Sequence, residues 1–169
     1  MNKLFSLIEK AKHSKLYLKI LNVMLARSIP FNKPHGFTIK EIYDDGFKIS
    51  LPYKRKNLNH IKGIHACALA TLAEYTSGLT LMLNLTSDDY RLIMKNISMT
   101  YHYQAKTDVV VSLSLNKEWM SAIVFTPLKN ADSIFTEIKV EVYDVLQNHI
   151  CTGLVNWQIK KWEKVKTVV

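Results

Sequence analysis

The sequence predicts a single α+β domain in which one curved antiparallel sheet wraps around one long apolar helix. Residues 64–83 form an apolar run of helical length, with no proline and no glycine before Gly78. Such a run is typical of a helix that is buried on all sides. Much of the remaining chain alternates apolar and polar residues in short segments, as half-buried strands do. A sheet that covers the helix from several directions satisfies both patterns.

The first element expected is an N-terminal helix over residues 1–28, in which apolar residues are interspersed with lysines. Pro30 and Pro34 end it, because proline cannot continue a helix. Packing on its own domain is the more common use of such a helix, although a basic amphipathic helix can also touch a membrane. A hairpin follows, with strands over 37–43 and 46–53 joined by a turn at Asp44-Asp45-Gly46.

The central helix is expected over residues 65–83, and four or five antiparallel strands follow it. Alternating apolar residues predict strands over 97–103, 109–115, 134–142 and 153–159. A further strand is expected over 119–125, ended by Pro127. No internal repeat or low-complexity segment divides the chain, so residues 1–169 are predicted to form one domain.

The chain is basic, because 23 Lys and Arg residues outnumber 14 Asp and Glu residues and give a net charge of +9. A basic surface suits nucleic acid, a membrane or a phosphate-bearing ligand. No cluster of arginine and aromatic residues accompanies the charge, so nucleic acid is not expected as a partner. The histidines and acids show no metal-ligand spacing, so no metal is expected.

The cysteines and the apolar segments indicate the cellular compartment in which the protein is expected. Cys67 and Cys151 are expected to be buried and unbonded. Polar residues inside the apolar run favour a buried helix over a membrane span, and no signal-peptide core is found near the N-terminus. We therefore expect a cytoplasmic protein that is not integral to a membrane.

Glu74 is a carboxylate in a position where a buried helix would not be expected to hold one. It lies midway along the apolar run, and burying a charge is costly unless something uses or compensates it. Apolar surroundings would raise its pKa, which suits a general base near neutral pH. The alternative is a structural acid that is paired with a lysine or hydrogen-bonded to the backbone.

The polar segment before the helix supplies candidate partners for Glu74, among them Asn59, His65 and the free backbone N–H groups at the helix start. Nine residues at about 100° each place His65 and Glu74 on opposite faces of one helix, about 13 Å apart along its axis. A site that uses both residues therefore has to be assembled from two subunits.

This spacing resembles the active-site pattern of hotdog-fold thioesterases of the phenylacetyl-CoA thioesterase type. Five residues separate Asn59 from His65, and Glu74 stands nine positions after that histidine. In the family, an asparagine, a glycine and a His-Gly-Gly sequence precede the acid, and Gly63 matches the first glycine. The resemblance covers the chain in order of elements from about residue 30 to residue 157.

Two positions depart from the family pattern. His-Gly-Gly is replaced by His65-Ala66-Cys67, which leaves the backbone less free to approach a ligand. Tyr103 stands where some members place a serine. An uncharacterised branch of the superfamily, in which alanine or cysteine replaces the glycines, is the most similar.

The resemblance implies a hotdog fold and the hydrolysis of an acyl thioester such as an acyl-CoA. Glu74 of one subunit would activate water, while Asn59, His65 and the backbone at Gly63 and Ala66 of the other would orient the water or hold the oxyanion. The implied assembly is a homodimer or a homotetramer, and coenzyme A belongs to the substrate, so no separate cofactor is expected. The residues expected to bind substrate are Lys54, Arg55, Lys56, Lys62 and Tyr103.

Two other functions remain open at this stage. His60, Gly63 and Glu74 also fit the His-to-Glu spacing of hotdog acyl-thioester dehydratases, whose prolines and second glycine are absent here. A non-catalytic acyl-CoA-binding protein would keep the pocket without turnover, and the Ala66-Cys67 departure favours it. The basic loop 54–56 could equally be a solvated surface.

Overall fold

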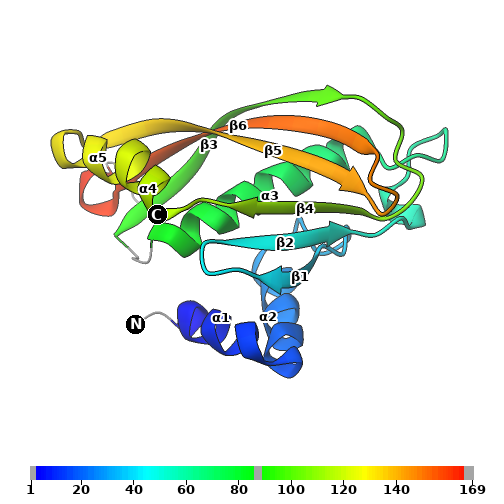
Figure 1. The fold of residues 1–169 in the computed structure, drawn as a ribbon, viewed down its shortest axis with the longest axis horizontal. Helices are drawn as coiled ribbons and strands as arrows, with labels where there is room; N and C mark the ends of the chain where they lie inside the picture. The colour runs from blue at the N-terminus through cyan, green and yellow to red at the C-terminus, as the bar shows by residue number, and fades with distance from the viewer. Residues whose placement is uncertain (1–2, 86–88, 166–169) are drawn as a thin grey trace.

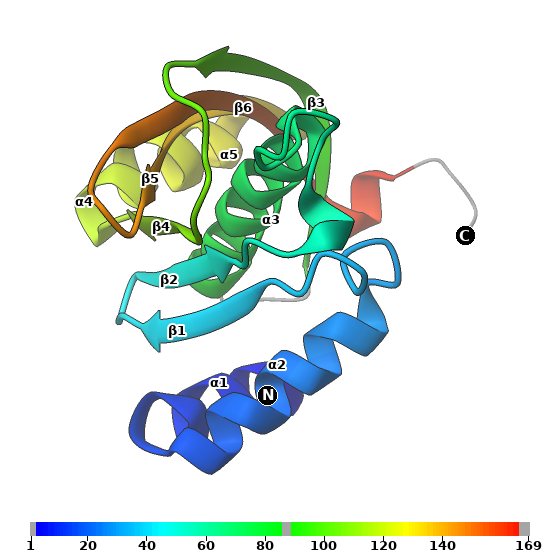
Figure 2. The ribbon, with the colours of Figure 1, turned by 90° about the vertical axis from the view of Figure 1, so that its right-hand side faces the viewer.

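The computed structural model describes residues 3–85 and 89–165, and its centre is helix α3 (Ala66–Leu85) in the concave side of one six-stranded antiparallel sheet (Figures 1 and 2). The predicted α+β fold is therefore confirmed. The strand order across the sheet is β1-β2-β4-β5-β6-β3. The strands are β1 (Thr38–Ile42), β2 (Gly46–Leu51), β3 (Tyr90–Tyr101), β4 (Val109–Ser114), β5 (Ser133–Asp144) and β6 (His149–Lys161).

Helix α3 is long and apolar enough to cross a membrane, but most of it is buried inside this domain. Leu72 and Leu81 are fully buried. Ser77 Oγ accepts a hydrogen bond of 3.0 Å from the indole Nε1 of Trp157 on β6, which satisfies two buried polar groups at once. The predicted central helix is confirmed, and it begins one residue later and ends two residues later than the expected 65–83.

The predicted hairpin is confirmed as β1 and β2, which are joined through the backbone hydrogen bond from Tyr43 N to Gly46 O at 2.8 Å. Gly46 also faces β4 closely, because a Cβ at this position would overlap the carbonyl oxygen of Leu113. Only glycine allows this approach without a shift of the backbone.

The N-terminal region forms two helices, α1 (Lys3–His13) and α2 (Lys15–Ser28), so the prediction of one helix over residues 1–28 was wrong within the described residues. Ser14 takes an extended conformation, with φ −143° and ψ 120°, and its carbonyl starts the second helix by accepting from Leu18 N. The break lets α1 fold back beside α2 below β1 (Figure 1). Ile8 of α1 and Leu21 of α2 are both buried. A single straight helix could not bury both apolar faces on the domain.

Strand β1 lies at one edge of the sheet, and α2 covers part of its outer side. Asn22 on α2 donates from Nδ2 to Ile39 O at 3.1 Å and accepts from Ile39 N at Oδ1 at 2.7 Å. The side-chain amide of Asn22 thus satisfies the N–H and the C=O of Ile39 as a neighbouring strand would. A bulge follows directly at Lys40.

Strand β3 lies at the other edge and, among the described strands, pairs only with β6. The predicted strand over 97–103 is confirmed in part, because the observed strand begins at Tyr90 and ends at Tyr101. A bulge at Lys95 shifts the register by one residue. Met94 and Ile97, on either side of the bulge, therefore both line the cavity beside α3.

The strand predicted over 119–125 is wrong, because these residues are helical. Asn116 caps the start by accepting from Trp119 N at 2.8 Å. Met120 and Val124, four residues apart, are buried on one helical face. The segment runs through α4 (Lys117–Trp119), η2 (Met120–Phe125) and α5 (Thr126–Asn130), and the other short helices are η1 (Arg55–Asn57) and η3 (Trp162–Lys164).

Candidate functional site

Glu74 opens into a cavity of about 570 Å³ between α3, the inner side of β3 and the segment that follows α2. The cavity is mainly apolar, and Glu74 is the only ionisable carboxylate among its lining residues. Such a space suits an apolar ligand. The residues that line it are Ile29, Phe31, Asn32, Ala70, Thr71, Glu74, Tyr75, Gly78, Leu79, Met82, Leu92, Met94, Ile97 and Trp157.

The Glu74 side chain has no structural partner in the part of the chain that the structure describes. None of the ion pairs or hydrogen bonds within residues 3–85 and 89–165 involves its carboxylate. The residue is half-buried, and this burial raises the pKa of Glu74 above the ordinary value of 4.5. The structural alternative, a carboxylate held by a lysine or by backbone N–H groups, is therefore not what these residues form.

Asn32 is a second polar group of the same cavity, and the sequence did not indicate it. It is only 7% exposed, and its side-chain amide has no hydrogen-bond partner among the described residues. Because Asn32 lines the cavity, its amide can bind water or a ligand there. In the sequence Asn32 is an ordinary polar residue between two prolines, so only the fold of segment 29–36 against α3 reveals it.

Asn59 and His65 stand at the start of α3, and both hold the local backbone. Asn59 Oδ1 accepts from Gly63 N at 3.0 Å and from Ile61 N at 3.1 Å, and the Nδ2 hydrogens have no partner among the described residues. His65 Nδ1 accepts from Cys67 N at 3.1 Å and so caps the helix. Cys67 itself is exposed, so the expectation that it is buried was wrong, whereas Cys151 is buried.

A second cavity of about 300 Å³ brings together three of the residues predicted for the site, Asn59, Ala66 and Tyr103. The backbone N–H of Ala66 has no partner in the described chain. By contrast, Gly63 N donates to Asn59 Oδ1 and His65 N donates to Asn57 O. Of the backbone donors expected to hold an oxyanion, Ala66 N–H is therefore the one that remains available.

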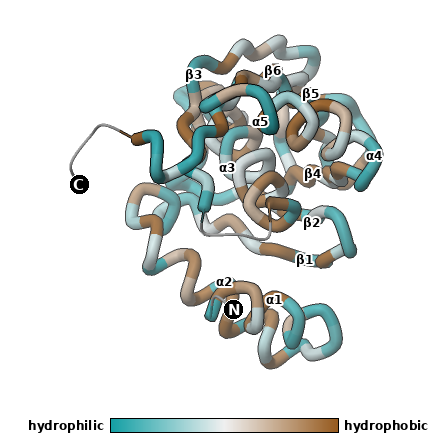
Figure 3. Tube along the Cα trace, turned by 90° about the vertical axis from the view of Figure 1, so that its left-hand side faces the viewer, coloured by the Kyte–Doolittle hydropathy of each residue, from teal (hydrophilic) through white to brown (hydrophobic). Residues whose placement is uncertain are grey.

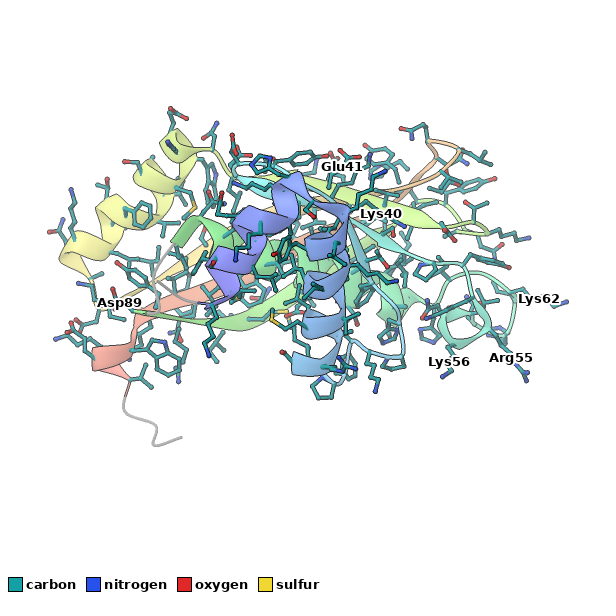
Figure 4. All side chains as sticks on the ribbon, turned by 90° about the horizontal axis from the view of Figure 1, so that it is seen from below. Lys40, Glu41, Arg55, Lys56, Lys62 and Asp89 are labelled. Atoms are coloured by element: carbon teal, nitrogen blue, oxygen red, sulfur yellow. The ribbon has the colours of Figure 1, made fainter. Side chains whose placement is uncertain are left out.

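The basic residues of loop 54–56 form a third feature. Lys54, Arg55 and Lys56 line a cavity of about 500 Å³ together with Lys33 and Pro34. Lys33 comes from the segment after α2 and was not indicated by the sequence. Lys62 lies apart from this cavity, on the loop before α3, and Figure 4 shows it at the same end of the molecule as Arg55 and Lys56. No group of three or more His, Cys, Asp or Glu residues in the described ranges is placed to hold a metal ion.

Asn57 connects the segment after α2 with the end of β2 and the loop before α3. It is almost fully buried, and its Nδ2 donates to His35 O and to Pro52 O, each at 2.9 Å. We expect Asn57→Ala to lower the free energy of unfolding by about 2–4 kcal/mol, because two buried carbonyls lose their donor. Urea unfolding measures this change, with the exposed Asn130→Ala as control. A loss no larger than that of the control would contradict this role.

One chain does not bring all the predicted site residues together. Glu74 opens into the first cavity, Asn59, Ala66 and Tyr103 line the second, and Lys54 lines the third. Asn59 lies on the loop before α3 and Glu74 lies midway along α3, so within one chain the two residues line different cavities. Within one chain, these residues therefore do not form one site.

A sheet of this order wrapped around one helix is a hotdog fold, and solved structures share it. The chain belongs to the family described as "Domain of unknown function (DUF4442)", which matches residues 18–166. No curated protein matches it.

Several solved structures share the fold. A protein of unknown function from Pseudomonas aeruginosa, described as a probable thioesterase, is 24% identical with a TM-score of 0.70, over 82% of this chain and 95% of that chain. A thioesterase from Haemophilus influenzae is 12% identical with a TM-score of 0.68, over 89% and 94%. A substituted form of a thioesterase from Staphylococcus aureus is 15% identical with a TM-score of 0.59, over 78% and 98%.

Proposed function

We propose that this protein is an acyl-CoA thioesterase in which Glu74 activates the attacking water. The observation that carries the proposal is a half-buried glutamate without a structural partner, in a cavity that is otherwise mainly apolar. A carboxylate whose pKa is raised by burial is a stronger base than an exposed one. Asn32, which lines the same cavity, would orient the water.

The reaction takes place in two steps. Glu74 removes a proton from water as the oxygen attacks the thioester carbonyl carbon, and the negative charge moves to the carbonyl oxygen. Ala66 N–H and Asn59 Nδ2 are the donors available to that oxyanion. The intermediate then collapses, the C–S bond breaks, and the proton held by Glu74 neutralises the departing thiolate. The products are a carboxylic acid and free coenzyme A.

We place the complete site between two copies of the chain that pair along β3. Both cavities reach this edge, since Met94 lines the first and Tyr103, just beyond the strand, lines the second. A two-fold axis between Ser98 and Met99, midway between those residues, would bring the first cavity of one copy beside the second cavity of the other. The part of β1 that Asn22 covers is not open to such pairing.

The spacing of Asn59 and Glu74 in the sequence supports the proposal that both residues act in the reaction. In the Staphylococcus aureus thioesterase, a glutamine and a glutamate that are fifteen positions apart were each substituted by alanine. Asn59 and Glu74 are also fifteen positions apart. Both pairs consist of a side-chain amide that precedes a carboxylate.

The phosphates of coenzyme A would bind to the basic end of the molecule. Lys33, Lys54, Arg55 and Lys56 offer four positive charges around one cavity, and Lys62 lies on the loop that Asn59 holds. Coenzyme A enters as part of the substrate, so the reaction needs no other cofactor. A cytoplasmic location, where acyl-CoA is available, is part of the same proposal.

A panel of acyl-CoA thioesters tests the proposal directly. Release of free thiol identifies a hydrolase, a change in alkene absorbance identifies a dehydratase or hydratase, and binding without either identifies a non-catalytic binder. We expect thiol release, with preference for apolar acyl groups. Alkene chemistry, or binding without turnover, would reject the hydrolase.

The loop before α3 separates the hydrolase from the dehydratase. We expect Asn59→Asp to lower thiol release strongly, because it keeps the oxygen that holds Gly63 N but removes the Nδ2 donor. His60→Ala should leave most activity, since His60 is exposed and lines none of the three cavities described above. Initial rates of thiol release measure both. The reverse ranking, together with hydration of an enoyl thioester, would move the assignment to the dehydratase class.

A further inference from the structure

The outer side of α2 carries an apolar stripe that no other described part of the chain covers. Leu16, Ile20 and Val23 follow one another at helical spacing, and Leu16 is 65% exposed. They line a surface cavity of about 630 Å³, while Leu21 and Leu25 on the opposite side of the helix are buried. The colouring of Figure 3 shows hydrophobic residues along α2 at the periphery of the molecule.

Positive charge surrounds this stripe. Lys19 and Arg27 line the same surface cavity, and Lys10 of α1 lies over the ring of Tyr17, with its Nζ 5.5 Å from the centroid. Glu9 is the only acidic residue between positions 3 and 35, and Lys12 pairs with it at 2.9 Å and with Asp44, from outside this range, at 3.2 Å. The seven cations in this range, which give it a net charge of 7 − 1 = +6, are Lys3, Lys10, Lys12, Lys15, Lys19, Arg27 and Lys33.

We propose that this surface, which we call the α2 face, docks on a lipid bilayer with anionic headgroups. The apolar side chains of Leu16, Ile20 and Val23 would enter the boundary between headgroups and acyl chains. Lysines beside the stripe would extend their ammonium groups to the lipid phosphates. An apolar stripe flanked by cations is complementary to a bilayer that has anionic headgroups outside and acyl chains inside.

The charge of the α2 face argues against a second copy as its occupant. Two such faces in contact would bring together two segments that each carry +6, and like charges oppose association. An anionic bilayer offers phosphates to the lysines and an acyl region to the apolar centre, so it matches both the charge and the apolar stripe.

Docking would also bring the Glu74 cavity close to the bilayer. Arg27 and Ser28 line the α2 face, and the chain continues directly to Ile29 and Phe31, which line the Glu74 cavity. Phe31 is 70% exposed at its rim. A membrane-held acyl thioester could then pass its chain into the cavity. This consequence rests on the proposed function, whereas the docking itself does not.

Cosedimentation of the full chain with lipid vesicles tests the proposal. We expect binding to vesicles of phosphatidylcholine with phosphatidylglycerol, weaker binding at high salt, and none to phosphatidylcholine alone. Ile20→Glu should abolish binding. Ile123→Glu is the matched control, because Ile123 lies on η2 and both isoleucines are 43% exposed. Lys19→Gln should weaken binding by roughly fivefold, since each cation near the surface contributes about that factor, whereas Lys129→Gln on α5 should not.

Several results would overturn the proposal. Equal binding to neutral and anionic vesicles would reject the role of charge, and equal loss in the Ile20 and Ile123 variants would reject the α2 face. Failure of the wild-type chain to bind anionic vesicles would reject docking itself. Dissociation of a larger assembly by Ile20→Glu, without vesicle binding by the wild type, would assign the face to contacts between copies. Thermal unfolding of each variant, together with thiol release from a soluble short-chain acyl-CoA, distinguishes these results from misfolding and from failure of the proposed reaction.

Discussion

Replacing Glu74 with glutamine is expected to reduce thiol release on the order of 10²-fold or more, because the variant keeps the shape of the side chain but loses the base. Folding should be retained. In the wild type, burial raises the pKa of the Glu74 carboxyl, so the ionised form destabilises the folded state above that pKa. Glutamine removes this cost, and the free energy of unfolding at neutral pH should stay equal or rise.

The pH dependence gives an independent measurement of the same role. Only ionised Glu74 can accept a proton, so the rate should fall as the pH decreases through its pKa. Because burial raises that pKa, the midpoint of the acid limb should lie above the ordinary glutamate value of 4.5. Glu137→Gln serves as control, because Glu137 is an exposed residue of β5. This variant should keep both the rate of thiol release and the acid limb of the pH profile. Wild-type turnover by Glu74→Gln would show that Glu74 is structural.

Mixing two inactive variants should restore activity if each site takes Glu74 from one copy and Asn59 from the other. Glu74→Gln and Asn59→Asp place their defects in different cavities of one chain. In a mixed dimer both defects would fall in one shared site, and the other site would be intact. Random pairing of equal amounts, by unfolding and refolding together, should therefore give about a quarter of wild-type thiol release.

The control for this experiment is a mixture of Glu74→Gln with Glu74→Ala, in which every site lacks the same group and no activity should return. Sedimentation of the wild type at micromolar concentration should show a dimer or a larger assembly. A stable monomer would reject the shared site. So would a mixture of Glu74→Gln and Asn59→Asp that stays inactive although mixed dimers form.

Much of the fold could be predicted because burial leaves a periodic trace in the sequence. The apolar run of α3 and the alternation along β5 and β6 each reflect a surface that the folded chain covers. The same rule failed at residues 119–125, where Met120 and Val124 are four apart and the cap at Asn116 decides for a helix. It also missed the break at Ser14, because apolar residues recur on both sides of it and only the extended conformation of Ser14, at the N-cap of α2, separates the two helices.

A residue of the candidate site could be predicted when a charged side chain stood in an apolar segment of the sequence. It could not be predicted when only tertiary contacts bring it to the site. Glu74 conflicts with its apolar run, so it could be found without a structure. Asn32 and Lys33 lie in a segment that carries no such conflict, and their neighbours are distant in sequence. The available donor at Ala66 could be identified only after the partners of Gly63 N and His65 N were known.

The hydrogen bonds between Asn22 and Ile39 have a consequence for how many chains can associate. A sheet with two open edges can add a further chain at each end and grow into a filament without limit. When part of one edge is occupied by the protein's own helix, pairing at the other edge uses up the open end, and a continuous sheet would stop at two chains. The amide of a single asparagine would thus limit the length of the shared sheet and keep a basic protein with long exposed strands from polymerising along it.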